Sequence, residues 1–303
     1  MALDFKKNTY PEIFEKLERV DHWLKSIKLK VEKTRFEVLV KNMFRISQSY
    51  QEDTLPDLCK EMGEETIITT LVDSAPFIRI YNAFANDASL TPRTSLEIAI
   101  SPKAPFMATD ENGACATNHA RNILFELELA ARLKSQGVKI IGLDDVWFEF
   151  GNARYNVQCK RPMRKNRLNE NIDEAIAQLR KRLNASDEKH NPRGIIAIAV
   201  DKIVGADKGF IRAKADNDLE RELLRKLENF VKRYSHLWAV GRIDIRVVGC
   251  IIFLKYVAYV ESTGVMSEGT QIYFDILAHP TIQAKDSGRL KDLGDLLKST
   301  PPL

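Results

Sequence analysis

The stretch DDVWFEFGNARYNVQCK (144–160) decides the fold, because it contains two short runs of alternating apolar and polar residues around a turn. The runs 144–150 and 154–160 both have the two-residue period of a strand with one buried face. Between them, Gly151 and Asn152 are residue types that favour turns. We therefore predict two antiparallel strands that form a hairpin.

The two faces of this hairpin depend on its pairing register. A loop of two or four residues, at 152–153 or 151–154, pairs residues whose numbers add to 305 and sets Asp145 opposite Lys160. The apolar face of this register consists of Val146, Phe148, Phe150, Tyr155, Val157 and Cys159. A slip by one residue would mix the faces. We therefore expect Asp145, Gln158 and Lys160 to share the polar face.

The polar face then holds a carboxylate, an amide oxygen and an ammonium group. Hard divalent cations such as Mg²⁺ bind oxygen ligands of this kind, together with water and substrate phosphate. A lysine beside such a metal can orient a water molecule and stabilise charge on a phosphate. The pattern is therefore compatible with phosphate chemistry, although a Gln-x-Lys tripeptide by itself is weak evidence.

A second carboxylate can come from the amphipathic helix expected over 118–137. Its apolar residues would pack on the sheet and leave Glu126 and Glu128 on the two flanks of that stripe. Helical spacing alone does not choose between these two acids.

The order of the remaining elements predicts an α/β fold. Helical patterns extend over 11–47 and from about 55 to 88, which indicates a mainly helical N-terminal region over 1–110. The second region, 111–303, contains in order a helix, three strands, a helix, a strand, a helix and a strand. We therefore expect a mixed central sheet flanked by helices.

With these residues in place, the chain resembles the PD-(D/E)XK nuclease superfamily, in its variant with glutamine in the last motif. The matching residues are Phe125-Glu126, eleven positions before Gly137, then Asp145 opening a strand, and then Gln158-Cys159-Lys160 ending the next. The spacing of FELELAARLKSQG (125–137) is similar to the Mrr-type restriction endonuclease helix, whose acid corresponds to Glu126. The likeness covers roughly residues 115–255 and implies a restriction-endonuclease-like core.

The resemblance implies a metal-dependent nuclease that hydrolyses phosphodiester bonds, of DNA in preference to RNA, in restriction or antiphage defence. Glu126 and Asp145 would hold Mg²⁺ or Mn²⁺, with the Gln158 oxygen as a neutral third ligand, and Lys160 would position the attacking water. Gln158 departs from the commoner Glu or Asp and removes one negative charge. An alternative function is therefore a catalytically inactive nuclease-fold protein that acts as a nucleic-acid-binding or assembly module.

A basic segment follows Lys160. Eight basic and three acidic side chains lie between Lys160 and Arg182, a local charge of +5, whereas the whole chain carries +4. Such a strip can attract a polyanion, and its alternative is a solvated loop and helix face. The candidate phosphate contacts are Arg161, Arg164, Lys165 and Arg167. The resemblance adds Gln178, in the following helix, as a residue that points toward the site.

Composition excludes other classes of protein. The most apolar stretch, 247–260, is interrupted by Lys255 and is shorter than the roughly 20 residues of a membrane span. The N-terminus lacks the apolar segment of a secretory signal. The four widely spaced cysteines predict neither a zinc site nor disulfides, and suit a cytoplasmic protein. A third interpretation makes the N-terminal helices a surface for dimerisation, which would give a homodimer, or for another partner, with the rest of the chain as a scaffold.

Overall fold

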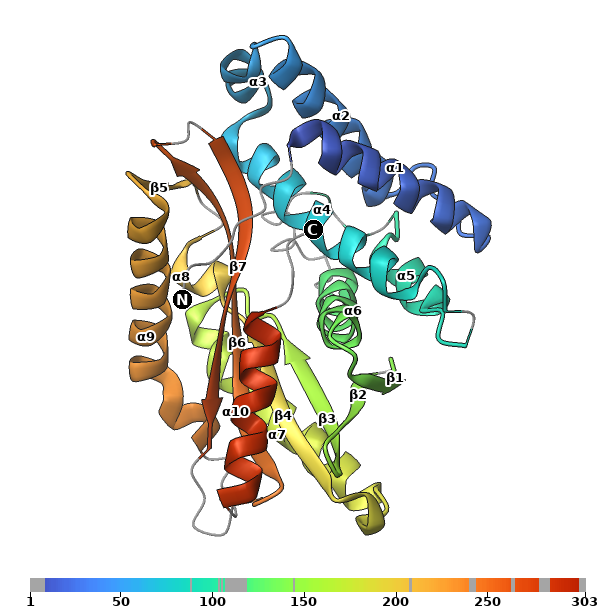
Figure 1. Ribbon diagram of the computed structural model, residues 1–303, viewed down its shortest axis with the longest axis vertical. Helices are drawn as coiled ribbons and strands as arrows, with labels where there is room; N and C mark the ends of the chain where they lie inside the picture. The colour runs from blue at the N-terminus through green and yellow to red at the C-terminus, as the bar shows by residue number, and fades with distance from the viewer. Residues whose placement is uncertain are drawn as a thin grey trace.

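The computed structural model describes residues 9–87, 89–102, 104, 106, 119–143, 145–206, 209–239, 244–262, 265–277 and 284–299. Within them, a seven-stranded mixed sheet is flanked by helices, with a helical region before it (Figure 1). The predicted α/β fold class is therefore confirmed. Residue 110, the expected domain boundary, lies outside the described residues, so the division into 1–110 and 111–303 stays a prediction.

Five helices form the N-terminal region: α1 (Tyr10–Ser26), α2 (Arg35–Gln51), α3 (Leu55–Met62), α4 (Glu64–Phe84) and α5 (Arg93–Ala99). The single helix expected over 11–47 is wrong, because α1 and α2 are separated by a turn. Lys28 and Lys33 in this turn have φ angles of 63°, which a right-handed helix excludes. Thr34 then caps α2, since its hydroxyl accepts a hydrogen bond from the Glu37 N–H.

The sheet has the order β1-β2-β3-β4-β6, with β5 and β7 also paired to β6. The strands are β1 (Lys139–Gly142), β2 (Val146–Phe150), β3 (Ala153–Lys160), β4 (Pro192–Ala199), β5 (Ile211–Ala213), β6 (Val247–Val260) and β7 (Val265–Ile276). The first three strands are antiparallel neighbours, whereas β3, β4 and β6 run parallel. The further helices are α6 (His119–Ser135), α7 (Leu168–Ala185), α8 (Asp201–Val204), α9 (Asp216–Ala239) and α10 (Ala284–Lys298). The predicted order of helix, three strands, helix and strand is therefore present from α6 to β4.

Each face of the sheet has its own apolar core. One core joins alternate sheet residues such as Val157 and Ile251 to α6, α10 and the N-terminal helices. The other joins Ile196 and Ile252 to α7 and α9. In Figure 1 the N-terminal helices lie together at the upper end of the molecule, above α6. Because one core contains residues from both sides of residue 110, α4 and the sheet stabilise each other.

The register of the β2–β3 hairpin corrects the sequence prediction. Val146 lies opposite Val157 and Phe148 opposite Tyr155, so paired numbers add to 303 rather than 305. The turn consists of Gly151 and Asn152, because the φ of 61° at Gly151 allows a tight two-residue turn there. A shift of two residues leaves the faces unchanged, so the predicted apolar face is correct.

The structure bears on two further expectations. Within the described part of the chain, no helix combines the length and the apolar character needed to cross a membrane. Cys59, Cys159 and Cys250 are free thiols, whereas Cys115 lies outside the described residues, as do residues 1–8.

Candidate active site between α7 and the β2–β3 hairpin

The polar face of β3 lies beneath α7. Asn156 and Gln158 are buried, with 2% and 3% of their surface exposed. The Gln158 amide donates a hydrogen bond to the Asn156 side-chain oxygen at 3.4 Å. The Asn156 amide nitrogen is buried and has no hydrogen-bond partner among the residues that the structure describes. Because a buried donor without a partner costs about 1–3 kcal/mol, apolar packing does not account for this pair of amides.

Asp145 stands immediately before β2, in the same layer as Gln158. Its φ of 57° is left-handed, a conformation that aspartate tolerates better than most residues. Its carboxylate forms an ion pair with Arg182 of α7. Because Val146 pairs with Val157, Asp145 is level with Gln158 and not with Lys160 as predicted. Two residues of strand, about 7 Å, separate that level from Lys160.

Lys160 ends β3 and also contacts α7. Its amine forms an ion pair with Glu174 at 3.2 Å, and 13% of the lysine side chain is exposed, compared with 54% for Glu174. Glu174 and Arg182 are eight residues apart, which is about 12 Å along a helix. Asp145 and Lys160 therefore face the same helix but have different partners on it.

Gln178 lies between these two partners. Glu174, Gln178 and Arg182 recur at four-residue steps and so form one stripe of α7. The two outer residues of the stripe contact Lys160 and Asp145, so Gln178 lies on the side of α7 that faces the hairpin; it is exposed, and its role at the site stays a prediction. The sequence reasoning did not identify Glu174 and Arg182. Their spacing about Gln178, in the helix after Gln158 and Lys160, was the available signal.

The two candidate acids of α6 have different surroundings. The Glu128 carboxylate is 1% exposed and forms ion pairs with Arg79 and Arg132, both at 3.0 Å, and with Lys255. Burial raises the pKa of Glu128, but these three cations outweigh burial and hold the pKa well below its usual value. Glu128 is therefore part of a buried cluster of ion pairs.

Glu126 is half-buried and lies near the carboxyl end of β3. Burial raises the pKa of the Cys159 thiol, and the charge of Glu126 raises it further, whereas Lys160 lowers it. Glu126 is therefore close to Cys159. It belongs to α6, however, on the face of the sheet opposite to α7. The structure brings Asp145, Gln158 and Lys160 into one layer and does not bring Glu126 into it, because α6 covers the opposite face of the sheet.

The oxygen atoms available at this site are those that a hard cation binds. Asp145 and Gln158 offer a carboxylate and an amide oxygen at one level of the hairpin. Arg182 neutralises Asp145, so a cation would replace the guanidinium group. Across the described ranges, no three His, Cys, Asp or Glu side chains gather as a metal site. The predicted ligand set differs from such a group of three, because it comprises two carboxylates and one amide oxygen.

The predicted phosphate contacts divide into two groups. Arg164, Lys165 and Arg167 are exposed in and before the short helix Lys165–Arg167, which connects β3 to α7. Arg161 is turned inward instead: 11% of its side chain is exposed, and its guanidinium group lies 3.7 Å from Asp201. The first three are accessible to a polyanion.

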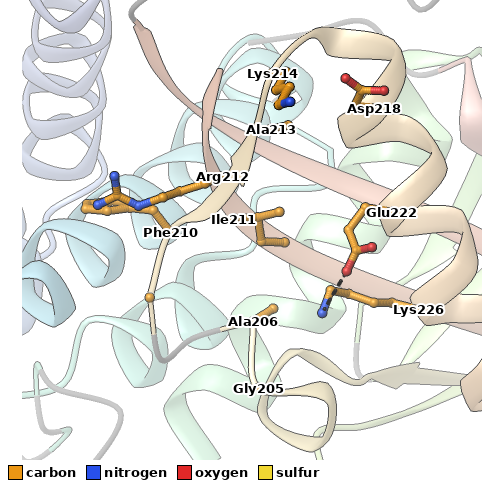
Figure 2. Close-up of a pocket in the computed structure, with 11 residues that line it drawn as sticks. Gly205, Ala206, Phe210, Ile211, Arg212, Ala213, Lys214, Asp218, Glu222 and Lys226 are labelled. Carbon is orange, nitrogen blue, oxygen red and sulfur yellow. Dashed lines mark ion pairs between the residues drawn. The ribbon is translucent and has the colours of Figure 1, made fainter. Parts of the chain in front are cut away.

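A cavity of about 790 Å³ lies away from these residues, between β5 and α9 (Figure 2). Its lining residues include Arg212 of β5, Lys214 just after β5, and Asp218 and Glu222 of α9. Figure 2 shows Glu222 paired with Lys226, at 3.3 Å. None of the predicted site residues lines this cavity.

Comparison of the chain with models of protein families, with curated proteins and with solved structures finds no match.

Proposed function

We propose that the chain is a metal-dependent nuclease, with DNA preferred to RNA, whose active site lies between α7 and the β2–β3 hairpin. One observation carries the proposal: Asp145, Gln158 and Lys160 share a layer at the point where the resemblance to PD-(D/E)XK nucleases places its motifs. The order of α6, β1, β2, β3, α7 and β4 supports it. Restriction or antiphage defence is the biological role that this resemblance implies.

In this proposal the residues have distinct roles. Asp145 and Gln158 would hold Mg²⁺ or Mn²⁺, whereas Glu126 lies on the opposite face of the sheet and is not a ligand in this proposal. When bound, the metal supplies Lewis acidity toward the phosphate and lowers the pKa of a bound water. Lys160 donates a hydrogen bond that orients the attacking water and stabilises negative charge on the phosphate. Arg164, Lys165 and Arg167 contact neighbouring phosphates.

The test is cleavage of supercoiled plasmid DNA, single-stranded DNA and RNA with Mg²⁺, with Mn²⁺ and with a chelator. We expect cleavage that needs the metal, and a loss of 100-fold or more in Asp145→Ala and Lys160→Ala, the order of magnitude of removing such groups. The matched controls are Asp57→Ala and Lys41→Ala, two exposed residues of the N-terminal helices, which should cut normally. Circular dichroism checks that each variant is folded. A folded wild type that cuts none of these substrates, or full activity in Asp145→Ala, would contradict the proposal.

A second function is favoured by a separate observation. Asp145 and Lys160 each have an ion-pair partner on α7, and Gln158 is neutral. The charges of this layer are therefore neutralised without a metal. This arrangement suits a nuclease-fold protein that binds nucleic acid without cutting it. Binding would then survive Asp145→Ala and Lys160→Ala. It would fall when Arg164, Lys165 and Arg167 are changed to Gln, and the salt dependence would decrease by about one unit of slope per lost phosphate contact.

A further inference from the structure

Trp147 of β2 fits the alternating pattern of this strand, but it does not pack in either apolar core. It is half-buried, whereas Trp23 and Trp238 are 7% and 0% exposed. Among the described residues, Trp147 belongs to neither of the two apolar cores and packs against neither of them. A tryptophan is a large apolar side chain to leave outside a core, so its position calls for another explanation.

The arrangement of β2 shows why Trp147 is outside both cores. Its neighbours Val146 and Phe148 point into the α6 side of the sheet and are 0% and 1% exposed. Trp147 therefore projects from the α7 side, opposite Asn156. The apolar layer beneath α7 and α9 contains residues of β4 and β6, and within the described residues it contains none of β2 or β3. The indole thus lies outside this layer, because β2 is two strands away from β4 in the sheet.

One side of the Trp147 ring lies next to β1. Gly142 of β1 pairs with Trp147, and a Cβ atom at Gly142 would lie 3.8 Å from two indole carbons. One edge of the indole therefore lies beside Gly142, at a distance where a Cβ atom there would make ordinary van der Waals contact. Its N–H has no hydrogen-bond partner within the described part of the chain, and no aromatic ring there stacks on it.

The position of Trp147 relative to Asp145 places the indole where it could bind part of a nucleic-acid substrate. Trp147 is two residues along the strand from Asp145, about 7 Å away, on the same face of the hairpin. Aromatic side chains bind nucleobases by stacking, and each stacked base contributes a factor of about 5 to 150 in affinity. A base inside a duplex is already stacked on its neighbours, so only an unpaired base is available to an aromatic platform.

We propose that Trp147 is a stacking platform for an unpaired base beside the scissile phosphate, so that the substrate is single-stranded or locally unpaired nucleic acid. This inference rests on the proposed function, since it places the reacting phosphate at Asp145. Arg182, which forms an ion pair with Asp145 and is the more exposed of the two side chains, would meet the phosphate.

Intrinsic fluorescence tests the platform without cleavage. The protein is titrated in a chelator with a 12-nucleotide single strand and with the matching duplex. We expect the single strand to quench the emission of the half-buried Trp147 and the duplex to quench it much less. Trp147→Ala should remove the quenching and weaken single-strand binding about 5- to 150-fold, while Trp147→Phe should retain part of the affinity. Ile141→Ala removes an exposed apolar side chain of the neighbouring strand β1 and should change neither.

The outcomes separate this inference from the function beneath it. If the wild type binds neither oligonucleotide, the proposed function fails together with the platform. If it binds and cuts nucleic acid but Trp147→Ala binds the single strand as tightly as the wild type, the platform alone is overturned. Equal quenching by duplex and single strand would also overturn it, because a paired base would then suffice.

Discussion

At the scale of single residues, buried charges attach the N-terminal helices to the sheet region. Asp73 of α4 contacts Arg35 of α2 at 2.8 Å and Arg121 of α6 at 3.0 Å. Arg79 of α4 contacts Glu128 of α6, which also contacts Lys255 of β6. Burying a charge is costly unless it is paired, so removing one partner exposes the full penalty of the other.

The carboxylate of Asp73 predicts a pH-dependent stability. Burial raises its pKa, but Arg121 and Arg35 outweigh burial and lower the pKa from 3.8 to about 2. A lowered pKa stabilises the folded state above pH 3.8, and this contribution is lost as the pH falls toward 2. Asp73→Asn should therefore lower the free energy of unfolding at pH 7 by about 2 kcal/mol or more and flatten its decline below pH 4.

Urea denaturation between pH 2 and 7 measures both effects. Asp57→Asn is the control, because Asp57 is 78% exposed and its partner Lys60 is 80% exposed. Surface pairs of this kind contribute little, so the control should follow the wild type. An Asp73→Asn variant that is as stable as the wild type at pH 7 would show that these ion pairs are not needed for stability.

At the scale of elements, the β2–β3 turn sets the register that aligns Asp145 with Gln158. Gly151 has a φ of 61°, and a Cβ atom there would lie 2.5 Å from the Arg289 side chain. Gly151→Ala should therefore destabilise the protein by about 1–2 kcal/mol, the cost of left-handed backbone in a residue with a side chain.

Gly288 offers the matched control. It lies in α10, and a Cβ atom there would meet nothing within 4 Å. Gly288→Ala should leave the stability unchanged or raise it by up to about 1 kcal/mol, because alanine favours a helix over glycine. Thermal or urea unfolding compares the two variants. Equal effects of both substitutions would mean that the turn at Gly151 does not depend on the backbone freedom of glycine.

At the scale of the whole molecule, the helical region and the sheet share one core. Phe36 of α2 and Phe77 of α4 belong to the same apolar cluster as Phe125 of α6 and Phe253 of β6. The last two rings contact edge to face, with their centroids 5.0 Å apart. Helix α4 also packs directly on α6, β6 and β7.

A chain that begins at residue 111 should therefore not fold to the native state by itself. Deleting residues 1–110 removes Asp73, a partner of Arg121, and Arg79, a partner of Glu128. It also exposes the apolar face of α6. We expect the full chain to unfold in one cooperative transition, and the truncated chain to lack near-ultraviolet circular dichroism and to aggregate. A truncated chain with native-like hydrogen-exchange protection would establish 111–303 as an independent domain.

The sequence by itself determined which residues share a face of the hairpin. Side chains alternate across a strand, so the parity of Val146, Phe148, Tyr155 and Val157 fixed the apolar side, whatever the length of the turn. The same local periodicity gave the succession of elements from α6 to β4. These features depend on neighbouring residues alone, and they held.

Tertiary structure decided what local pattern leaves open. The tight turn that Gly151 allows gives a register that differs by two residues from the predicted one. The two flanks of α6 differ because Arg79 and Lys255 pack around Glu128 on one of them. The partners of Asp145 and Lys160 come from α7, which follows both of them in the chain. Contacts between distant segments depend on how whole helices pack, and a period of two or of 3.6 residues contains no information about that packing.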